Sequence, residues 1–160
     1  MGFGFPAALG AKMGHRDRDV VCITGDGGFQ MNMQEMATAV VQQTPITVCL
    51  LNNYYLGMVR QMQQLFYGKR YSATCLRRRK GCEHCKGPNE NCPPYVPDFM
   101  KWAESYGAHG IRVTKEEDII PALEAAKQNT DAPTVIEFMV ATEEIVLPMV
   151  PGGNPMNNMI

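Results

Sequence analysis

Short apolar runs alternate with amphipathic segments along most of the chain. Four runs are apolar and rich in β-branched residues, which predicts buried strands at residues 20–24, 46–51, 109–113 and 134–140. The segments between them have helical spacing of their apolar positions, at residues 6–13, 33–41, 59–66, 98–106 and from 118 onward. Strands that alternate with helices in this way predict a doubly wound α/β fold with a mostly parallel sheet flanked by helices.

Polar residues before these segments predict where the helices begin. Asn32 with Glu35 three residues later has the spacing of a capping box. Asp98 precedes another helix, and Gly107 follows it as a left-handed terminator. Asp118 is the expected cap of the last helix. The apolar faces predicted for the first two of these helices are Met33, Met36, Ala37, Val40 and Val41, and Phe99, Trp102, Ala103 and Tyr106.

The pattern divides the chain into one domain and a tail. Residues 1–145 form the domain, and a cysteine-rich insertion interrupts it at about residues 73–96. Residues 146–160 form an extended C-terminal arm, because prolines and glycines are frequent at its start.

Composition narrows the classes of partner. The chain has 160 residues, of which 45% are hydrophobic and 19% charged, and its net charge is -1. This balance is typical of a soluble globular domain and gives no field that attracts nucleic acid or anionic lipid. No cationic leader is visible, and no apolar run reaches the roughly 20 residues of a membrane helix. We therefore expect a cytoplasmic protein.

The loops that follow the first two strands carry the candidate chemistry. Asp26 follows the first strand and Asn53 the second, and the carboxyl ends of neighbouring parallel strands meet at one edge of a sheet. Their oxygens suit a hard cation such as Mg²⁺. Gly27 and Gly28 offer backbone N–H groups near a helix start, where an anion is favoured. The pair of loops predicts a site for a metal-bound phosphate.

The spacing of these loops resembles a known motif. Gly25-Asp26-Gly27, followed after 24 residues by Asn52-Asn53, resembles the thiamine diphosphate-binding motif. Within that superfamily the chain is similar to the carboxyl-terminal domain of the acetolactate (acetohydroxyacid) synthase catalytic subunit. The segments that support this narrower resemblance are residues 1–11, 57–59, 65–67, 70–72 and 146–151.

The resemblance implies roles for single residues. Asp26 and Asn53 would be side-chain ligands of Mg²⁺, and Tyr55 would supply a backbone carbonyl. Met58 and Met62 would lie in the substrate region. The residues implied to contact thiamine diphosphate are Met1, Asp26, Gly27, Gly28, Asn53, Tyr55, Leu56, Gly57 and Met58.

The resemblance also implies an activity that this chain cannot complete alone. The family condenses pyruvate with a second 2-ketoacid in branched-chain amino acid biosynthesis. Its proton-relay glutamate lies on the N-terminal domain of a partner subunit, and its FAD site lies largely in a middle domain. We therefore expect a catalytic residue from outside the chain, a homo-oligomer (dimer or tetramer) and a regulatory small subunit. Alternatives are a subunit of a split thiamine-dependent 2-ketoacid decarboxylase and a non-catalytic binding module.

Six cysteines fall into two groups. Cys22 and Cys49 lie in apolar runs and are expected to be buried thiols. The other four have the spacing C-x6-C-x2-C-x6-C at Cys75, Cys82, Cys85 and Cys92, with His84 as a spare ligand. In a reducing compartment this set favours Zn²⁺ or an iron–sulfur cluster, with free thiols and disulfides as the alternatives.

Overall fold

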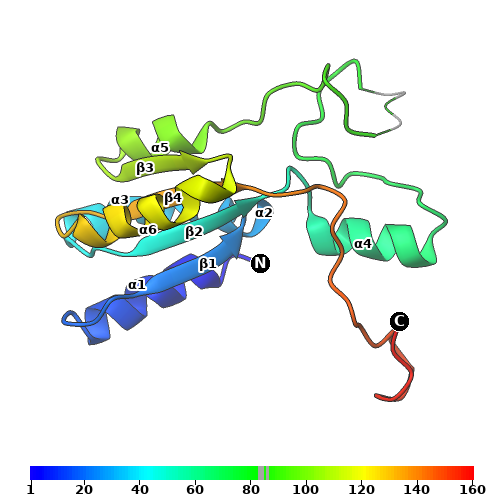
Figure 1. Cartoon of the computed structure of the whole chain (residues 1–160), viewed down its shortest axis with the longest axis horizontal. Helices are drawn as coiled ribbons and strands as arrows, with labels where there is room; N and C mark the ends of the chain where they lie inside the picture. The colour runs from blue at the N-terminus through cyan, green and yellow to red at the C-terminus, as the bar shows by residue number, and fades with distance from the viewer. Residues whose placement is uncertain (83–84, 86) are drawn as a thin grey trace.

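A computed structural model describes residues 1–82, 85 and 87–160 and contains one parallel sheet. Its strands are β1 (Val21–Gly25), β2 (Thr47–Asn52), β3 (His109–Val113) and β4 (Thr134–Met139). They are arranged in the order β1-β2-β4-β3, and each adjacent pair is parallel. Figure 1 shows this sheet with its helices. The four predicted strands and the parallel α/β class are confirmed.

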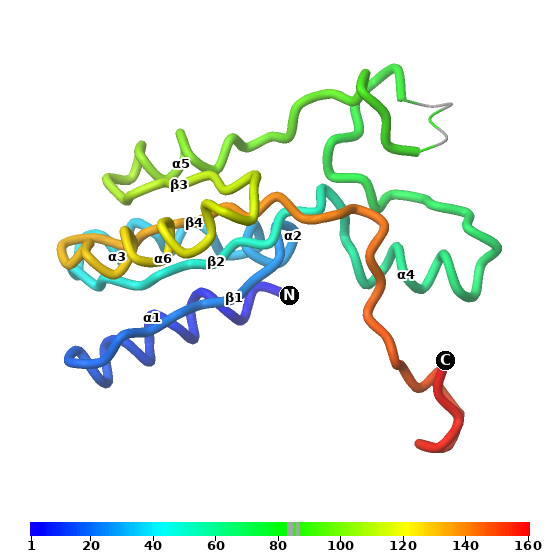
Figure 2. The backbone as a smooth tube through the Cα atoms, in the orientation of Figure 1, coloured from blue at the N-terminus to red at the C-terminus, as the bar shows by residue number. Residues whose placement is uncertain are grey.

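Helices cover both faces of the sheet, but unequally. They are α1 (Gly4–Gly14), α2 (Asp26–Phe29), α3 (Met36–Val41), α4 (Gly57–Phe66), α5 (Phe99–Ser105) and α6 (Ile119–Gln128), with short 3₁₀ turns at Met33–Glu35 and Glu116–Asp118. Side chains of α1, α3 and α5 share one core cluster, and α6 contributes to a second. Val21 and Ile23 of β1 remain 55% and 72% exposed. In Figure 2, α4 lies beyond the carboxyl ends of the strands.

The core follows the alternation of side chains along the strands. Val135 of β4 faces the larger cluster, and the next residue, Ile136, faces the smaller one. Phe29 lies at the centre of the larger cluster, with its ring centroid 5.4 Å from that of Phe5 and 5.3 Å from that of Trp102. This aromatic group fixes α2, and therefore the loop that begins at its N-terminus, against the sheet.

The predicted capping box at Asn32 is wrong. The Asn32 side chain makes no cap bond and instead donates to the Gly2 carbonyl at 2.8 Å. The chain then makes a 3₁₀ turn before α3, which rotates the following residues relative to a continuous helix. As a result Ala39 is buried, whereas Val41, which was predicted to be apolar-facing, is 76% exposed.

The residues that predicted the ends of the later helices were more reliable indicators. Asp98 caps α5, since its carboxylate accepts from the Met100 N–H at 3.2 Å, and Gly107 has φ +82°. Asp118 immediately precedes α6 but makes no side-chain cap bond, because a 3₁₀ turn ends there. Pro121 falls in the first turn as expected, where its missing N–H leaves no helical bond unmade.

The insertion and the C-terminal segment both lie beside α4. Residues 54–56 and 74–76 form a short antiparallel bridge, with the Leu56 N–H bound to the Thr74 carbonyl at 2.9 Å. Residues 140–160 form no helix or strand, and Gln61 of α4 binds both backbone groups of Val146. Within the described ranges, no helix has the length and apolar character needed to span a membrane.

Candidate functional site

The sheet brings the two predicted loops together. Gly25, the last residue of β1, is opposite Leu51 near the end of β2, so Asp26 and Asn52 emerge side by side. Asp26 is the first residue of α2 and is only 2% exposed. Its Oδ2 accepts from the Tyr54 N–H at 3.0 Å, which directly links the first loop to the second.

The Asp26 carboxyl is buried without a cation beside it. Burial raises its pKa to about 6, although hydrogen bonds from the Gly27 and Tyr54 N–H groups and from the Tyr95 hydroxyl oppose that rise. Asp26 forms no ion pair with a basic side chain in the described part of the chain. A buried carboxyl of this kind fits a hard cation, because the cation would offset the cost of burying its charge.

The second loop carries further oxygen atoms on the residues next to Tyr54. Asn53 Oδ1 accepts from the Tyr55 N–H at 3.0 Å, which holds the Asn53 side chain over its own loop. Tyr54 has φ +67°, a left-handed conformation that turns the backbone back toward Asp26. Among the described residues no backbone N–H binds the Tyr55 carbonyl, whereas the Tyr54 carbonyl is occupied by the Leu76 N–H at 2.8 Å. Of these two neighbouring carbonyls, the Tyr55 carbonyl is therefore the one without a backbone donor among the described residues.

Several other predicted residues surround Gly27. A Cβ at Gly27 would lie 2.6 Å from Leu56 Cδ2 and 3.7 Å from Met1 Cε, so both side chains lie over this turn. Leu76 of the insertion would lie 3.3 Å from the same position and was not predicted. Gly28, the next residue, would place a Cβ 3.5 Å from the Thr24 hydroxyl, which is ordinary contact.

The remaining predicted residues are at the start of α4. A Cβ at Gly57 would lie 2.8 Å from Asn53 Nδ2, so glycine permits the loop to approach the helix closely. Met58 is 53% exposed, and Met62 is partly buried one helical turn later. Residues four apart share one helix face, so these two side chains can contact the same ligand.

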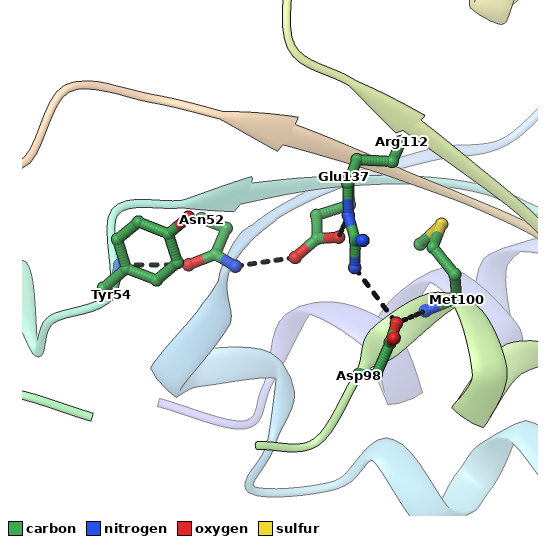
Figure 3. A network of polar contacts seen from close by, with 6 residues as sticks. All are labelled: Asn52, Tyr54, Asp98, Met100, Arg112 and Glu137. Atoms are coloured by element: carbon green, nitrogen blue, oxygen red, sulfur yellow. Dashed lines mark hydrogen bonds and ion pairs between the residues drawn. The ribbon is translucent and has the colours of Figure 1, made fainter. Parts of the chain in front are cut away.

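A buried polar network that the sequence analysis missed supports the second loop (Figure 3). Glu137, in the middle of β4, is 2% exposed and accepts from Asn52 Nδ2 and Arg112 Nε, both at 2.6 Å. Asn52 Oδ1 in turn accepts from the Tyr54 N–H at 3.0 Å, and Arg112 also pairs with Asp98 at 3.0 Å. The network thus connects the N-terminus of α5 to the loop that faces Asp26. Its only sequence signal is a single acidic residue in an otherwise apolar strand.

The cysteines do not form the expected metal centre. All six are free thiols, with Cys22 and Cys49 buried as predicted. Across residues 1–82, 85 and 87–160, no three His, Cys, Asp or Glu side chains are grouped to hold a metal. The exposed Cys85 donates instead to the Gly87 carbonyl at 3.2 Å, and Cys92 Sγ accepts from the Asn89 N–H at 3.3 Å. The predicted spare ligand, His84, lies outside the described residues.

Comparisons with known proteins agree on one kind of domain. Residues 1–138 match the family described as thiamine pyrophosphate enzyme, C-terminal TPP binding domain. The acetolactate synthase large subunit of Corynebacterium glutamicum is 47% identical over 154 residues, which cover 96% of this chain and 22% of that protein. The acetolactate synthase large subunit of Haemophilus influenzae is 40% identical over 160 residues, covering 100% of this chain and 25% of that protein.

A solved structure supports the same fold. The thiamine diphosphate-dependent 4-hydroxybenzoylformate decarboxylase of Rhodococcus jostii RHA1 matches with a TM-score of 0.69 and 28% identity. The match covers 91% of this chain and 24% of that one. The chain therefore spans about a quarter of the length of the proteins that it resembles.

Proposed function

The chain belongs to the thiamine pyrophosphate enzymes, as their C-terminal TPP-binding domain, and on that premise we propose that it holds the metal–diphosphate end of thiamine diphosphate in an acetolactate synthase. One observation carries the proposal. The buried Asp26 carboxyl, with its pKa raised to about 6, binds the loop after β2 and forms no ion pair with a basic side chain among the described residues. A divalent cation would balance the charge of that carboxylate, and diphosphate oxygens would complete the coordination of the cation.

Each residue around the gap has a role in this proposal. Asp26 and Asn53 hold Mg²⁺ through side-chain oxygens, and Tyr55 holds it through its carbonyl. The backbone N–H groups of Gly27 and Gly28 bind diphosphate oxygens, as amides at a helix start do. Thiamine diphosphate, when bound, supplies the nucleophilic carbon that decarboxylates a 2-ketoacid. The side chains implied to flank the rest of the cofactor are Met1, Leu56 and Met58.

The activity of the complete enzyme is a further part of the proposal. The relatives named acetolactate synthase large subunit support pyruvate and a second 2-ketoacid as substrates, with Met58 and Met62 beside them. The proton-relay carboxylate and an FAD site would be provided by the remaining three quarters of such a protein. We expect the 160-residue chain to bind cofactor but to be inactive alone. A cytoplasmic homo-oligomer with a regulatory small subunit completes the proposal.

The sequence identities favour acetolactate synthesis over simple decarboxylation. The decarboxylase from Rhodococcus jostii is 28% identical, whereas the two acetolactate synthase large subunits are 47% and 40% identical over at least 96% of the chain. A decarboxylase releases an aldehyde, whereas a carboligase passes the two-carbon unit to a second ketoacid. The cofactor site described above serves both reactions.

Calorimetry tests the proposed site. The chain is titrated with thiamine diphosphate in the presence of Mg²⁺, and again in the presence of EDTA. We expect saturable binding that requires the metal and that disappears in Asp26→Ala. Asp17→Ala is the matched control, because Asp17 is an exposed aspartate outside the site. Wild-type protein that binds no cofactor with Mg²⁺ would contradict the proposal.

A further inference from the structure

The cysteine-rich insertion encloses a second cavity, apart from the Asp26 loop. It has a volume of about 580 Å³, which is in the usual range for small-molecule sites. Its walls come from the start of α4, from residues between 69 and 78, and from Cys82, Cys85, Cys92 and their described neighbours, with Glu143 at one side. The backbone bridge between Tyr55 and Cys75 forms its floor.

The charge around this cavity is strongly unbalanced. Four cationic side chains, from Arg60, Lys69, Arg77 and Arg78, line it, and Glu143 is the single carboxylate that lines it among the described residues. The chain as a whole has a net charge of -1, so this excess of positive charge is local. An excess of cations around a partly enclosed space raises the local concentration of anions.

Two of these guanidinium groups are also incompletely hydrogen-bonded. The Arg60 side chain is 5% exposed, and its Nη2 pairs with Glu143 at 2.7 Å, yet its Nε has no partner. Arg77 Nε is likewise out of contact with water and unpartnered. Because both Nε atoms are out of contact with water, a ligand in the cavity would reach these arginines through their terminal Nη groups.

Aromatic rings hold both guanidinium groups in place. Arg60 Cζ lies 4.4 Å from the centroid of the Tyr71 ring and 5.2 Å from that of Tyr55, and Arg77 Cζ lies 4.0 Å from that of Tyr54. Stacking on a ring face fixes the plane of an arginine while its edge remains free to donate hydrogen bonds. The arginines are therefore oriented before any ligand arrives.

We propose that this cavity binds a small oxoanion with more than one negative charge, either a phosphate group or a polycarboxylate. The ligand's oxygens accept hydrogen bonds from Arg60, Arg77 and Arg78, and its charge offsets the local excess that Glu143 leaves unpaired. Lys69, which is exposed, contributes at the rim. Tyr55 borders both this cavity and the proposed cofactor site, but the arginines that bind the anion are not among the residues proposed to hold the cofactor.

The test is calorimetric titration of the full chain at constant ionic strength, with inorganic phosphate in one arm and citrate in the other. We expect saturable binding of at least one of the two anions, which identifies the chemical class. Arg77→Gln and Arg78→Gln each lower the affinity about tenfold or more, because each removes a charged donor. Arg60→Gln has the same effect if circular dichroism shows that this buried variant folds. Mg²⁺ and thiamine diphosphate are added in a parallel titration to fill the other site.

Two control variants distinguish specific binding in the cavity from non-specific attraction by the positive charge of the region. Arg70→Gln removes the same charge from an exposed position outside the cavity and is expected to change the affinity less than twofold. Glu143→Gln removes the competing carboxylate and is expected to raise the affinity severalfold. The proposal is overturned if neither anion binds saturably, or if Arg70→Gln weakens binding as much as Arg77→Gln does. It is also overturned if saturating thiamine diphosphate abolishes the binding.

Discussion

Replacing Asp26 by asparagine is expected to stabilise the metal-free protein at neutral pH. The Asp26 carboxyl has a pKa of about 6 when folded, against its ordinary value of 3.8, because burial penalises its charge. One pKa unit between the folded and unfolded states is worth about 1.4 kcal/mol, so the ionised carboxylate costs the folded state about 3 kcal/mol. Asparagine keeps one oxygen that can accept from the Tyr54 N–H but replaces the other carboxylate oxygen, so one of the donors around Asp26 loses its acceptor. The lost acceptor costs about 1 to 3 kcal/mol, so we expect a net gain of about 0 to 2 kcal/mol.

The direction of the pH dependence follows from the raised pKa. Below pH 3.8 the carboxyl is protonated in both states, and Asp26→Asn has little effect. As the pH rises from 3.8 to about 6, the unfolded state releases its proton first, so the wild type loses stability. Above pH 6 the difference between variant and wild type is constant and largest. Urea unfolding followed by circular dichroism between pH 3.5 and 8 measures it.

Adding Mg²⁺ and thiamine diphosphate should reverse the order of stability. A ligand at about one hundred times its dissociation constant adds about 2.7 kcal/mol to the protein that binds it. Wild type gains this stabilisation and Asp26→Asn does not. An Asp26→Asn protein that is less stable than wild type at pH 8 would refute the burial argument, whereas equal stabilisation by the cofactor would refute the ligand role.

Three further predictions concern the sheet and the buried thiols. Glu137→Gln leaves either the buried Asn52 Nδ2 or the partly exposed Arg112 Nε without an acceptor, and it should lower the free energy of unfolding by about 1 to 3 kcal/mol in urea titrations. An unchanged midpoint would contradict the network's importance. Gly110→Ala should lower the free energy of unfolding by about 1 to 3 kcal/mol, because the new Cβ would lie 3.2 Å from the backbone of α5. Gly10→Ala is the control, since its Cβ meets nothing within 4 Å and the change should be neutral or stabilising. Similar losses of stability in both variants would disprove the steric explanation. Burial raises the pKa of the Cys22 and Cys49 thiols, so both should react with a thiol reagent at pH 8 only as the protein unfolds. Rapid modification of all six thiols in the native protein would show instead that these two are accessible.

The meeting of the two loops was predictable because each of them directly follows a strand. Strand ends fix where a loop begins, and parallel neighbours bring their loops to the same edge, so Asp26 and Asn53 could be paired from their spacing. Helix details were less predictable. Asn32 has the side chain and spacing of a cap, but its amide donates instead to the carbonyl of Gly2, which lies 30 residues away in the sequence.

Contacts between distant segments could hardly be predicted from the sequence. Glu137 binds Asn52 across 85 residues, and nothing in the composition of either strand identifies the other as its partner. The cysteine spacing predicted a metal centre, yet Cys85 and Cys92 bind nearby backbone groups, and the described part of the insertion lines a cationic cavity. Spacing along a loop without helices or strands does not fix the distances between its side chains.

The sequence alone therefore determined the order of the strands along the chain, the parallel sheet and the two loops that meet at the candidate site. These features depend on periodicity and on local turn chemistry, which act over a few residues. The tertiary structure decided the burial of Asp26, the support of its neighbouring loop by Glu137 and the grouping of Arg60 and Arg77 around a cavity. Burial and pairing depend on which segments meet when the chain packs, and those meetings join residues that lie far apart in the sequence.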